Sequence, residues 1–309
     1  MSNSNQNINF IVRTIRVADC PDLRELWCQI YSNKSSKFKS APEVAISIDP
    51  NGLFVAQDLS TGKLIGSCSG IKVSPNLGFI GGYAVSPEYQ GQGIGPVMWK
   101  KVMDYLGDIN IALFPRDQEM GEKYGKKWNF QIAKHKRLVH MTGKVVLNDD
   151  ICVKNIDGIT VCPITTDLLS GVIDYDSDVC NGIDRRLFIE GVINFPETWN
   201  LVAINERREV CGYCIIYSAN CDVTIVGPLY ADNEQLAELL VTRCLQLLPE
   251  DRLQNVKYHC WDINLKSIAI AEKFGLKLTV NRPIMYSKQT IDGKLDKIFT
   301  VSSTMYYPF

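Results

Sequence analysis

The sequence predicts an α/β (α+β) protein with two tandem domains, each a mixed, mostly antiparallel sheet flanked by helices. The first observation is length, because 309 residues is about twice the size of a common single domain. The second is patterning, because short alternating apolar runs interleave with segments of helical periodicity along the chain. The third is repetition, because much of the element order of the first half recurs in the second half.

The first half predicts the element order βααβββαβαβ. Asp19 and Pro21 favour a helix start, because an Asp side chain caps free N–H groups and proline suits a first turn. A turn at residues 59–63 joins two strands into a hairpin. The expected strands are residues 11–17, 53–57, 64–73, 77–85, 109–114 and 131–140, and the expected helices are residues 19–30, 41–48, 96–106 and 117–127.

A polar connector in the middle of the chain predicts the domain boundary. We expect a disordered polar tail at residues 1–9, an N-terminal domain at 10–145, a linker at 146–158 and a C-terminal domain at 159–309. In the second half, the expected strands are residues 201–205, 210–218, 223–229, 256–261, a segment near 285 and 298–304, and the expected helices are residues 233–248 and 264–274.

Composition argues against several functional classes. The net charge is −1, but residues 1–144 carry 18 basic and 12 acidic side chains, and the remainder carries 15 and 22. This basic excess suits an anionic ligand and is too small to predict nucleic-acid binding. The chain has no run of about eighteen apolar residues and no signal peptide, so we expect a cytoplasmic protein without membrane contact. A lone CxxC pair and three histidines predict no metal site, and the oligomeric state stays open.

Residues 85–96 combine a strand end, a glycine-rich loop and a helix start. Such a loop aims consecutive backbone N–H groups at one point, and the helix N-terminus adds partial positive charge. A dinucleotide fingerprint would need glycine where Pro96 stands, and a P-loop would end in Gly-Lys-Ser/Thr. The segment therefore predicts a phosphate-binding loop of another kind, with a plain surface turn as the alternative.

Gln90, Gly93 and Gly95 match the Gln/Arg-x-x-Gly-x-Gly/Ala loop of the GNAT acetyltransferase superfamily, which residues 10–140 resemble. The resemblance implies acetyl-CoA as cofactor, with its pyrophosphate on the loop and its pantetheine arm beside the end of the preceding strand. It also implies that this strand is splayed from its neighbour, and Gly81 and Gly82 are compatible with that. The cofactor-binding residues so implied are Tyr83, Ala84, Val85, Gln90, Gly91, Gln92, Gly93, Ile94, Gly95 and Pro96.

The reaction that the resemblance implies is direct attack of a small-molecule primary amine on the thioester carbonyl. A backbone N–H near Val85 would stabilise the oxyanion. The chain departs from the family at the acid, because the usual tyrosine position, five residues before Phe130, is Gly125. Tyr124, one place off, is the candidate catalytic acid, and a packing aromatic is its alternative interpretation. Asn129 replaces the glycine of the family pattern, which asparagine can do because it tolerates left-handed φ.

The C-terminal half resembles a degenerate GNAT domain without the pyrophosphate loop, since Asp232 and Glu234 stand where the loop would bind an anion. Asp184 and Arg185 lie in a segment similar to one found in two-domain members, which implies a role in orienting the acceptor. A structural salt bridge is the alternative for this pair, and His259 is interpreted as a core histidine. For the whole chain, the alternative to an enzyme is a non-catalytic acyl-CoA-binding protein. No general base is identified, and the acceptor stays open among small amines, amino acids, polyamines and peptide N-termini.

Overall fold

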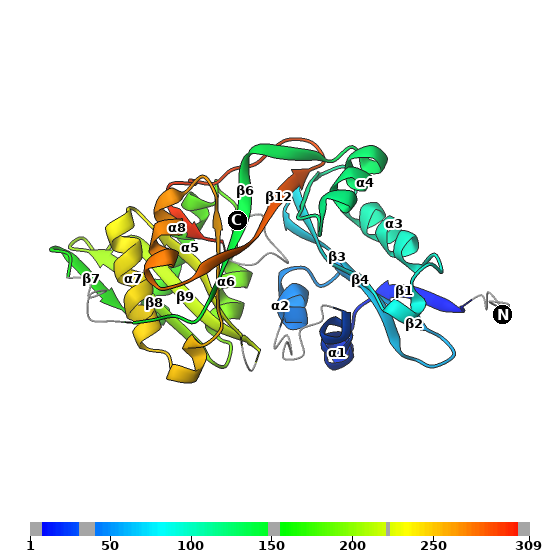
Figure 1. Ribbon diagram of the computed structural model, residues 1–309, viewed down its shortest axis with the longest axis horizontal. Coiled ribbons are helices and arrows are strands. Elements are labelled where there is room, and N and C mark those ends of the chain that lie inside the picture. The colour runs from blue at the N-terminus through cyan, green and yellow to red at the C-terminus, as the bar shows by residue number, and fades with distance from the viewer. Residues whose placement is uncertain (1–7, 31–40, 148–154, 221–222, 302–309) are drawn as a thin grey trace.

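A computed structural model describes residues 8–30, 41–147, 155–220 and 223–301, without the side chains of residues 219 and 220. Residues 1–7 and 148–154 lie outside this description, and they include most of the expected tail and much of the expected linker. The domain boundaries therefore stay predictions. Figure 1 shows the N-terminal half on the right and the C-terminal half on the left, with β6 and β12 crossing between them.

The first half has the predicted order βααβββαβαβ. Its elements are β1 (Phe10–Thr14), α1 (Cys20–Ile30), α2 (Ala41–Ile48), β2 (Leu53–Asp58), β3 (Leu64–Ser74), β4 (Leu77–Val85), α3 (Ile94–Leu106), β5 (Asn110–Leu113), α4 (Gln118–Trp128) and β6 (Gln131–Gly143). The clearest boundary errors are at the end of β1, which stops three residues before the predicted end, at the end of β6, which continues three residues beyond it, and at the start of α3, which begins two residues early.

The second half contains three elements that the sequence analysis missed, namely β7 (Ile159–Cys162), α5 (Thr166–Val179) and α6 (Arg186–Ile193). With them it repeats the order of the first half. The remaining elements are β8 (Thr198–Asn205), β9 (Val210–Asn220), β10 (Val223–Ala231), α7 (Glu234–Gln246), β11 (Val256–Trp261), α8 (Leu265–Lys273), β12 (Lys277–Tyr286) and β13 (Ile298–Thr300). Within the described ranges, no helix is long and apolar enough to cross a membrane.

The two halves share one sheet because they exchange strands. Its order is β1-β2-β3-β4-β5-β12-β6-β11-β10-β9-β8-β7, with β13 beside β10. β12, from the second half, lies between β5 and β6, where Met285 pairs with Leu113. In turn β6, from the first half, pairs with β11, where His140 lies opposite His259. Each half therefore supplies a strand that completes the pairing of the other.

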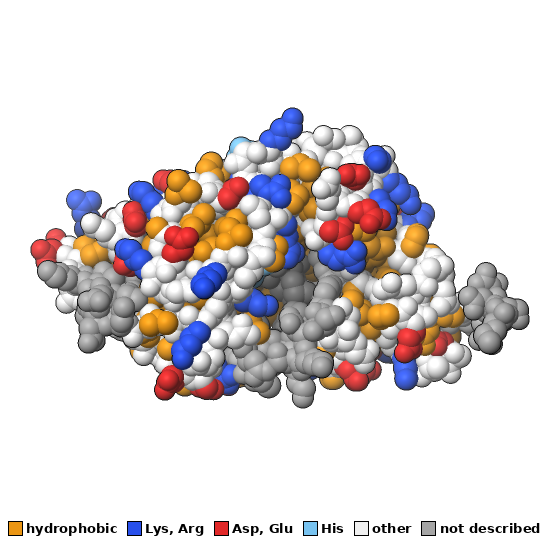
Figure 2. Space-filling view, in the orientation of Figure 1, with side chains coloured by type: hydrophobic (Ala, Val, Ile, Leu, Met, Phe, Trp, Pro, Cys, Tyr) orange, Lys and Arg blue, Asp and Glu red, His pale blue; other side chains and the backbone are white. Residues whose placement is uncertain are grey.

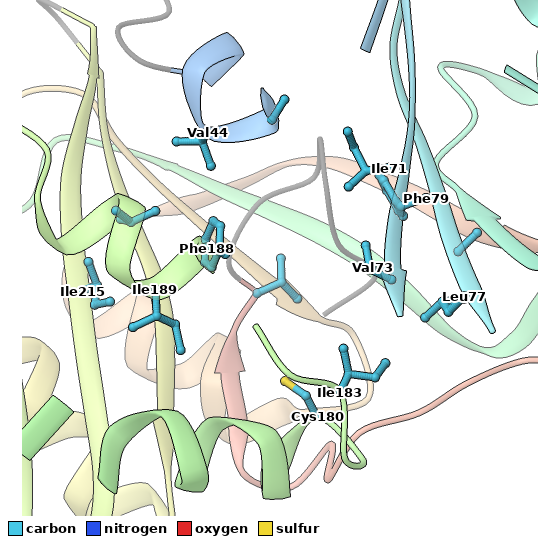
Figure 3. Close-up of a cluster of buried hydrophobic side chains, with 14 of the residues drawn as sticks. Val44, Ile71, Val73, Leu77, Phe79, Cys180, Ile183, Phe188, Ile189 and Ile215 are labelled. Carbon is cyan, nitrogen blue, oxygen red and sulfur yellow. The ribbon is translucent and has the colours of Figure 1, made fainter. Parts of the chain in front are cut away.

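An apolar cluster also joins the halves on one face of the sheet. α2 packs against α6, and the cluster includes Val44 of α2, Phe188 of α6 and Phe79 of β4. Figure 3 shows these side chains gathered between elements of both halves. On the opposite face, separate clusters lie under α3 and α4 in the first half and under α7 and α8 in the second. The junction thus combines backbone pairing with buried apolar contact.

We expect residues 1–147 expressed alone to lack a cooperative fold. Without β12, β5 and β6 lose the strand that joins them, and both are left with unpaired edges. Urea unfolding followed by circular dichroism should show a broad, weak transition for this fragment and a single steep one for the full chain. Co-expression with residues 148–309 is the control, and it should restore the steep transition. A steep transition for the isolated fragment would contradict the prediction.

Candidate active site

A bulge lies near the end of β4. The register between β3 and β4 shifts there, so that two residue steps of β3 lie opposite three steps of β4. Gly82 in the bulge has a φ of +55°, which glycine adopts without strain. Its carbonyl accepts a hydrogen bond from the Ser67 hydroxyl (2.7 Å), which in turn accepts one from the Trp27 indole (2.8 Å). These buried side chains hold the bulge in place.

Beyond the bulge, β4 separates from β5. Their parallel pairing ends at Ile80 and Leu113, as the splayed strand implied by the resemblance requires. The amide of Ser86 donates to Ile65 O of β3 (2.9 Å). Along an antiparallel pair, residues bonded to the partner alternate with residues whose N–H points to the opposite edge. The Val85 N–H therefore points away from β3, toward the split.

The loop after β4 presents free backbone donors. Gly91 and Gly93 have φ values of +77° and +81°, and no described atom lies within 4 Å of a Cβ built on either. α3 begins at Ile94, with Gly93 as its N-cap and no acidic residue in the first turn. The positive end of the helix dipole is therefore not neutralised. Pro96 has no N–H to donate, so its predicted part in cofactor binding would come from the shape of the first turn and not from a backbone hydrogen bond.

The two glutamines of the loop fold back onto it. Gln90 Nε2 donates to Val85 O (3.0 Å), and Gln92 Nε2 donates to Glu88 O (3.1 Å). The backbone N–H of Gln90 is also in use, since it donates to Pro87 O (3.3 Å). Gln90 therefore ties the loop to the end of β4, and the free donors of the loop come from the residues after it.

Tyr83 connects the end of β4 to the first turn of α3. A Cβ on Gly95 would lie 2.5 Å from the Tyr83 hydroxyl oxygen, so a side chain at position 95 would force the end of this tyrosine to shift. The ring of Tyr83 also packs edge-on against Trp99 of α3, with centroids 5.6 Å apart. Burial raises the pKa of Tyr83 to about 12, so its hydroxyl is protonated at neutral pH.

Tyr124 lies within an aromatic cluster beside the split. Its ring stacks on Trp99, with centroids 4.9 Å apart and planes 15° apart, and it contacts Phe130. Only 6% of Tyr124 is exposed, and burial raises the pKa of its hydroxyl. Asn129 ends α4 with a left-handed φ of 57°, as the sequence predicts. The one-residue offset from the family spacing therefore leaves Tyr124 packed inside, and its role as an acid stays a prediction.

Comparison with known protein families shows which family each half of the chain resembles. Residues 20–114 match the model of the acetyltransferase (GNAT) family, and residues 172–300 match the model of an acetyltransferase (GNAT) domain. The chain belongs to the GNAT acetyltransferase family. An uncharacterized protein of Caenorhabditis elegans is 27% identical over 182 residues, which are 52% of this chain and 51% of that protein. The matched segment thus spans about half the length of this relative.

Solved GNAT structures share the two-domain fold. A putative acetyltransferase from Pyrococcus horikoshii has a TM-score of 0.75 at 18% identity, with 99% of this chain and 98% of that chain covered. A tandem GNAT protein from the clavulanic acid biosynthesis pathway has a TM-score of 0.67 at 11% identity, with coverage of 91% and 100%. At these identities the likeness concerns the fold, and it extends over both halves.

The lysines of α4 in the N-terminal GNAT domain form a solvated face. Lys123 pairs with Glu119 (2.7 Å), and Lys126 lies 3.8 Å from Glu122. Figure 2 shows basic and acidic side chains mixed over this helix. Exposed pairs at this helical spacing contribute little stability and leave little net charge. In the part of the chain that the structure describes, no group of three His, Cys, Asp or Glu side chains is arranged to hold a metal ion.

In the second GNAT domain, a side chain caps the helix N-terminus that is uncapped in the first domain. α7 follows β10 as α3 follows β4, but its N-cap Asn233 accepts a hydrogen bond from the Leu236 amide (3.0 Å). Glu234 adds negative charge in the first turn. A side chain thus occupies a donor that a phosphate would need, in agreement with the absence of a glycine loop from this half.

Asp184 and Arg185 do not form one acceptor-binding pair. Arg185 is 1% exposed, and its Nε donates to Asp176 Oδ1 (2.9 Å) while its Nη2 donates to Asp176 Oδ2 and to the Tyr213 hydroxyl. The expected contact of Arg185 with an acceptor is therefore corrected to a buried structural salt bridge, although the partner differs from Asp184. Asp184 is exposed and accepts a hydrogen bond from the Arg186 amide (2.8 Å) at the start of α6.

We expect Gly95→Ala to destabilise the fold by about 1–3 kcal/mol, because the new methyl group would overlap the Tyr83 hydroxyl. Tyr83→Phe removes that oxygen, so the double variant should regain much of the loss. Urea unfolding of the two single variants and the double variant measures this coupling. If the two changes prove additive, the contact between Gly95 and Tyr83 does not set the requirement for glycine.

Proposed function

We propose that the protein is a cytoplasmic, acetyl-CoA-dependent N-acetyltransferase that transfers an acetyl group to a primary amine of a small molecule by direct attack. The carrying observation is that free backbone donors occur at two nearby places, the split at Val85 and the segment from Gly91 to the uncapped start of α3. The pantetheine arm of acetyl-CoA would use the donors at the split, and its negatively charged diphosphate would use those at the start of α3. The glycines at 91 and 93, with open space around them, suit close approach of such a ligand.

The diphosphate fits the first turn of α3. The amides of Ile94 and Gly95 lie in this turn without intrahelical partners, and α3 carries no acidic side chain there. A phosphate at such an end gains charge-assisted hydrogen bonds and the favourable helix dipole. Gly91, Gln92 and Gly93 would supply further backbone contacts. Tyr83, Ala84 and Val85 would line the arm, because the edge of β4 that they share is free of β5.

Acetyl-CoA supplies an activated acyl thioester at the split. The Val85 N–H would donate to the negative charge that develops on the thioester carbonyl oxygen, an effect of about 3 kcal/mol for one donor in other enzymes. Tyr124 would hold a proton for the departing thiolate, and its buried ring, which packs on Trp99 as the ring of Tyr83 does, supports this role. Its hydroxyl makes no hydrogen bond to a described residue, so it would be free to donate.

The C-terminal domain would shape the acceptor side. Its β12 extends the sheet directly beside β5, so that Met285 lies opposite Leu113 at the split. The packing of α2 against α6 encloses the same face of the sheet. The general base is not assigned, and a water molecule or a residue of the second domain would serve.

The deciding experiment is an assay of thiol release by the purified full chain with acetyl-CoA and a panel of primary amines, with mass spectrometry of the products. We expect one acceptor class to release thiol and gain an acetyl group. If the protein binds acetyl-CoA and releases no thiol with any amine, the alternative of a non-catalytic acyl-CoA-binding protein replaces this proposal. If it does not bind acetyl-CoA, both are wrong.

We expect Tyr124→Phe to lower kcat about 100-fold with little change in acetyl-CoA binding. Burial raises the Tyr124 pKa, so the hydroxyl keeps its proton through neutral and mildly alkaline pH. The kcat of the wild type should therefore show no loss from Tyr124 ionisation between about pH 7 and 9. Tyr175→Phe, a change at a tyrosine of the second domain, is the matched control. An unchanged kcat for Tyr124→Phe would reduce Tyr124 to a packing aromatic.

A further inference from the structure

Four side chains meet where the halves exchange strands. They are Lys257 and His259 of β11, His140 of β6 and Arg282 of β12, and we call them the junction cluster. His140 lies opposite His259, and the centroids of their rings are 4.1 Å apart. Arg282 lies opposite Leu138, two residues from His140, so it projects from the same face. The first half supplies one member of the cluster and the second half supplies three.

Three nitrogen atoms of the junction cluster are buried without a hydrogen-bond partner among the described residues. They are Nε2 of His140, Nε2 of His259 and Nε of Arg282. His259 is only 7% exposed. Trp261, two residues further along the same face of β11, also leaves its indole N–H unpaired. Buried donors without partners are costly, so the arrangement points to a bound group that supplies acceptors.

The cluster carries positive charge that no carboxylate offsets. Neither Lys257 nor Arg282 pairs with an Asp or Glu in the part of the chain that the structure describes. Burial and the two cations lower the pKa of His140 to about 3, and burial, His140 and the same cations lower that of His259. Both imidazoles are therefore neutral at pH 7, and each has one N–H to donate.

This donor set matches a carboxylate better than a cation or a neutral amide. Two imidazole N–H groups, the Arg282 Nε–H and the Lys257 ammonium can supply four donors, and a carboxylate presents about four lone-pair sites. The charges of Arg282 and Lys257 repel a cation. A carboxylate would give the orphaned nitrogen atoms acceptors and offset part of the buried charge.

The junction cluster lies close to the split between β4 and β5. Phe114, which follows β5, contacts the ring of Trp261 with centroids 6.2 Å apart. Trp261 and His259 share one face of β11, as alternate residues of a strand do. β5 and β6 are two strand spacings apart across β12, or about 10 Å. Along β12, Arg282 lies three residues from the Met285–Leu113 pair, or about 10 Å, and Val280, opposite His140, lies five residues from it. An extended molecule is therefore needed to reach from the split to the cluster.

We propose that the junction cluster binds a carboxylate of the acceptor, so that the substrate class is an amine that also carries a carboxylate. This inference rests on the proposed function, because only that function makes the bound amine the acceptor of the acetyl group. The carboxylate site itself stands on the cluster and is tested by binding alone.

The test is isothermal titration of the full chain, without acetyl-CoA, with 6-aminohexanoate and with hexylamine, which differs by lacking the carboxylate. We expect the wild type to bind 6-aminohexanoate at least about tenfold more tightly. Arg282→Gln should remove this preference, and so should Lys257→Gln, which provides a second variant if Arg282→Gln fails to fold. Arg207→Gln, at an exposed arginine in the turn after β8, is the matched control and should keep the preference.

Equal affinity for the two probes, or no binding of either, would overturn the proposal and leave the cluster satisfied by ordered water alone. A preference that survives in both Arg282→Gln and Lys257→Gln would also overturn it. Tighter binding of 6-aminohexylphosphonate than of 6-aminohexanoate would replace the carboxylate by a phosphate-like group. If the carboxylate preference holds and the amine assay releases no thiol, the proposed function fails while the carboxylate site stands.

Discussion

Backbone hydrogen bonding across β5, β12, β6 and β11 is the constraint on which the molecule depends. A strand at the edge of a sheet leaves a row of backbone N–H and C=O groups unpaired, and here each half supplies a strand that pairs with such an edge of the other. The exchange fixes the two halves in one register, with Met285 beside Leu113 and His140 beside His259. It therefore fixes the distance between the β4–β5 split and the junction cluster, which would vary if the two halves moved as separate domains.

Against this continuous pairing, the split between β4 and β5 is a local departure that needs support. The backbone groups beyond Ile80 lose β5 as a partner, and a buried edge of this kind is costly unless a ligand or solvent pairs with it. The hydrogen-bonded chain from Trp27 through Ser67 to Gly82 O stabilises the bulge from the β3 side. The hydrogen bonds that stabilise the bulge thus come from the β3 side of β4, and the backbone groups on the β5 side stay unpaired.

Local signals in the sequence predict local features and miss those set by distant partners. The glycine loop, the left-handed Asn129 and the element order of the first half follow from residue types over short windows. The helix α5 was missed because Gly171 and its β-branched and acidic residues give it low helix propensity, and packing decides its state. For the same reason the partner of Arg185 was not foreseen, since Asp176 lies on that helix. The strand exchange has no local signature at all.

The two halves share one topology but differ at the N-terminus of the helix that follows β4 in the first half and β10 in the second. In both, a strand leads into a helix whose first amides lack intrahelical partners, and the difference lies in a few side chains. Gly93 leaves the amides of α3 free, whereas Asn233 and Glu234 cap and neutralise those of α7. A phosphate at α7 would have to displace a hydrogen bond and approach a carboxylate. The second half therefore lacks an open helix end for an anion, and the basic side chains that it adds to the junction cluster, Lys257 and Arg282, lie on strands rather than at a helix end.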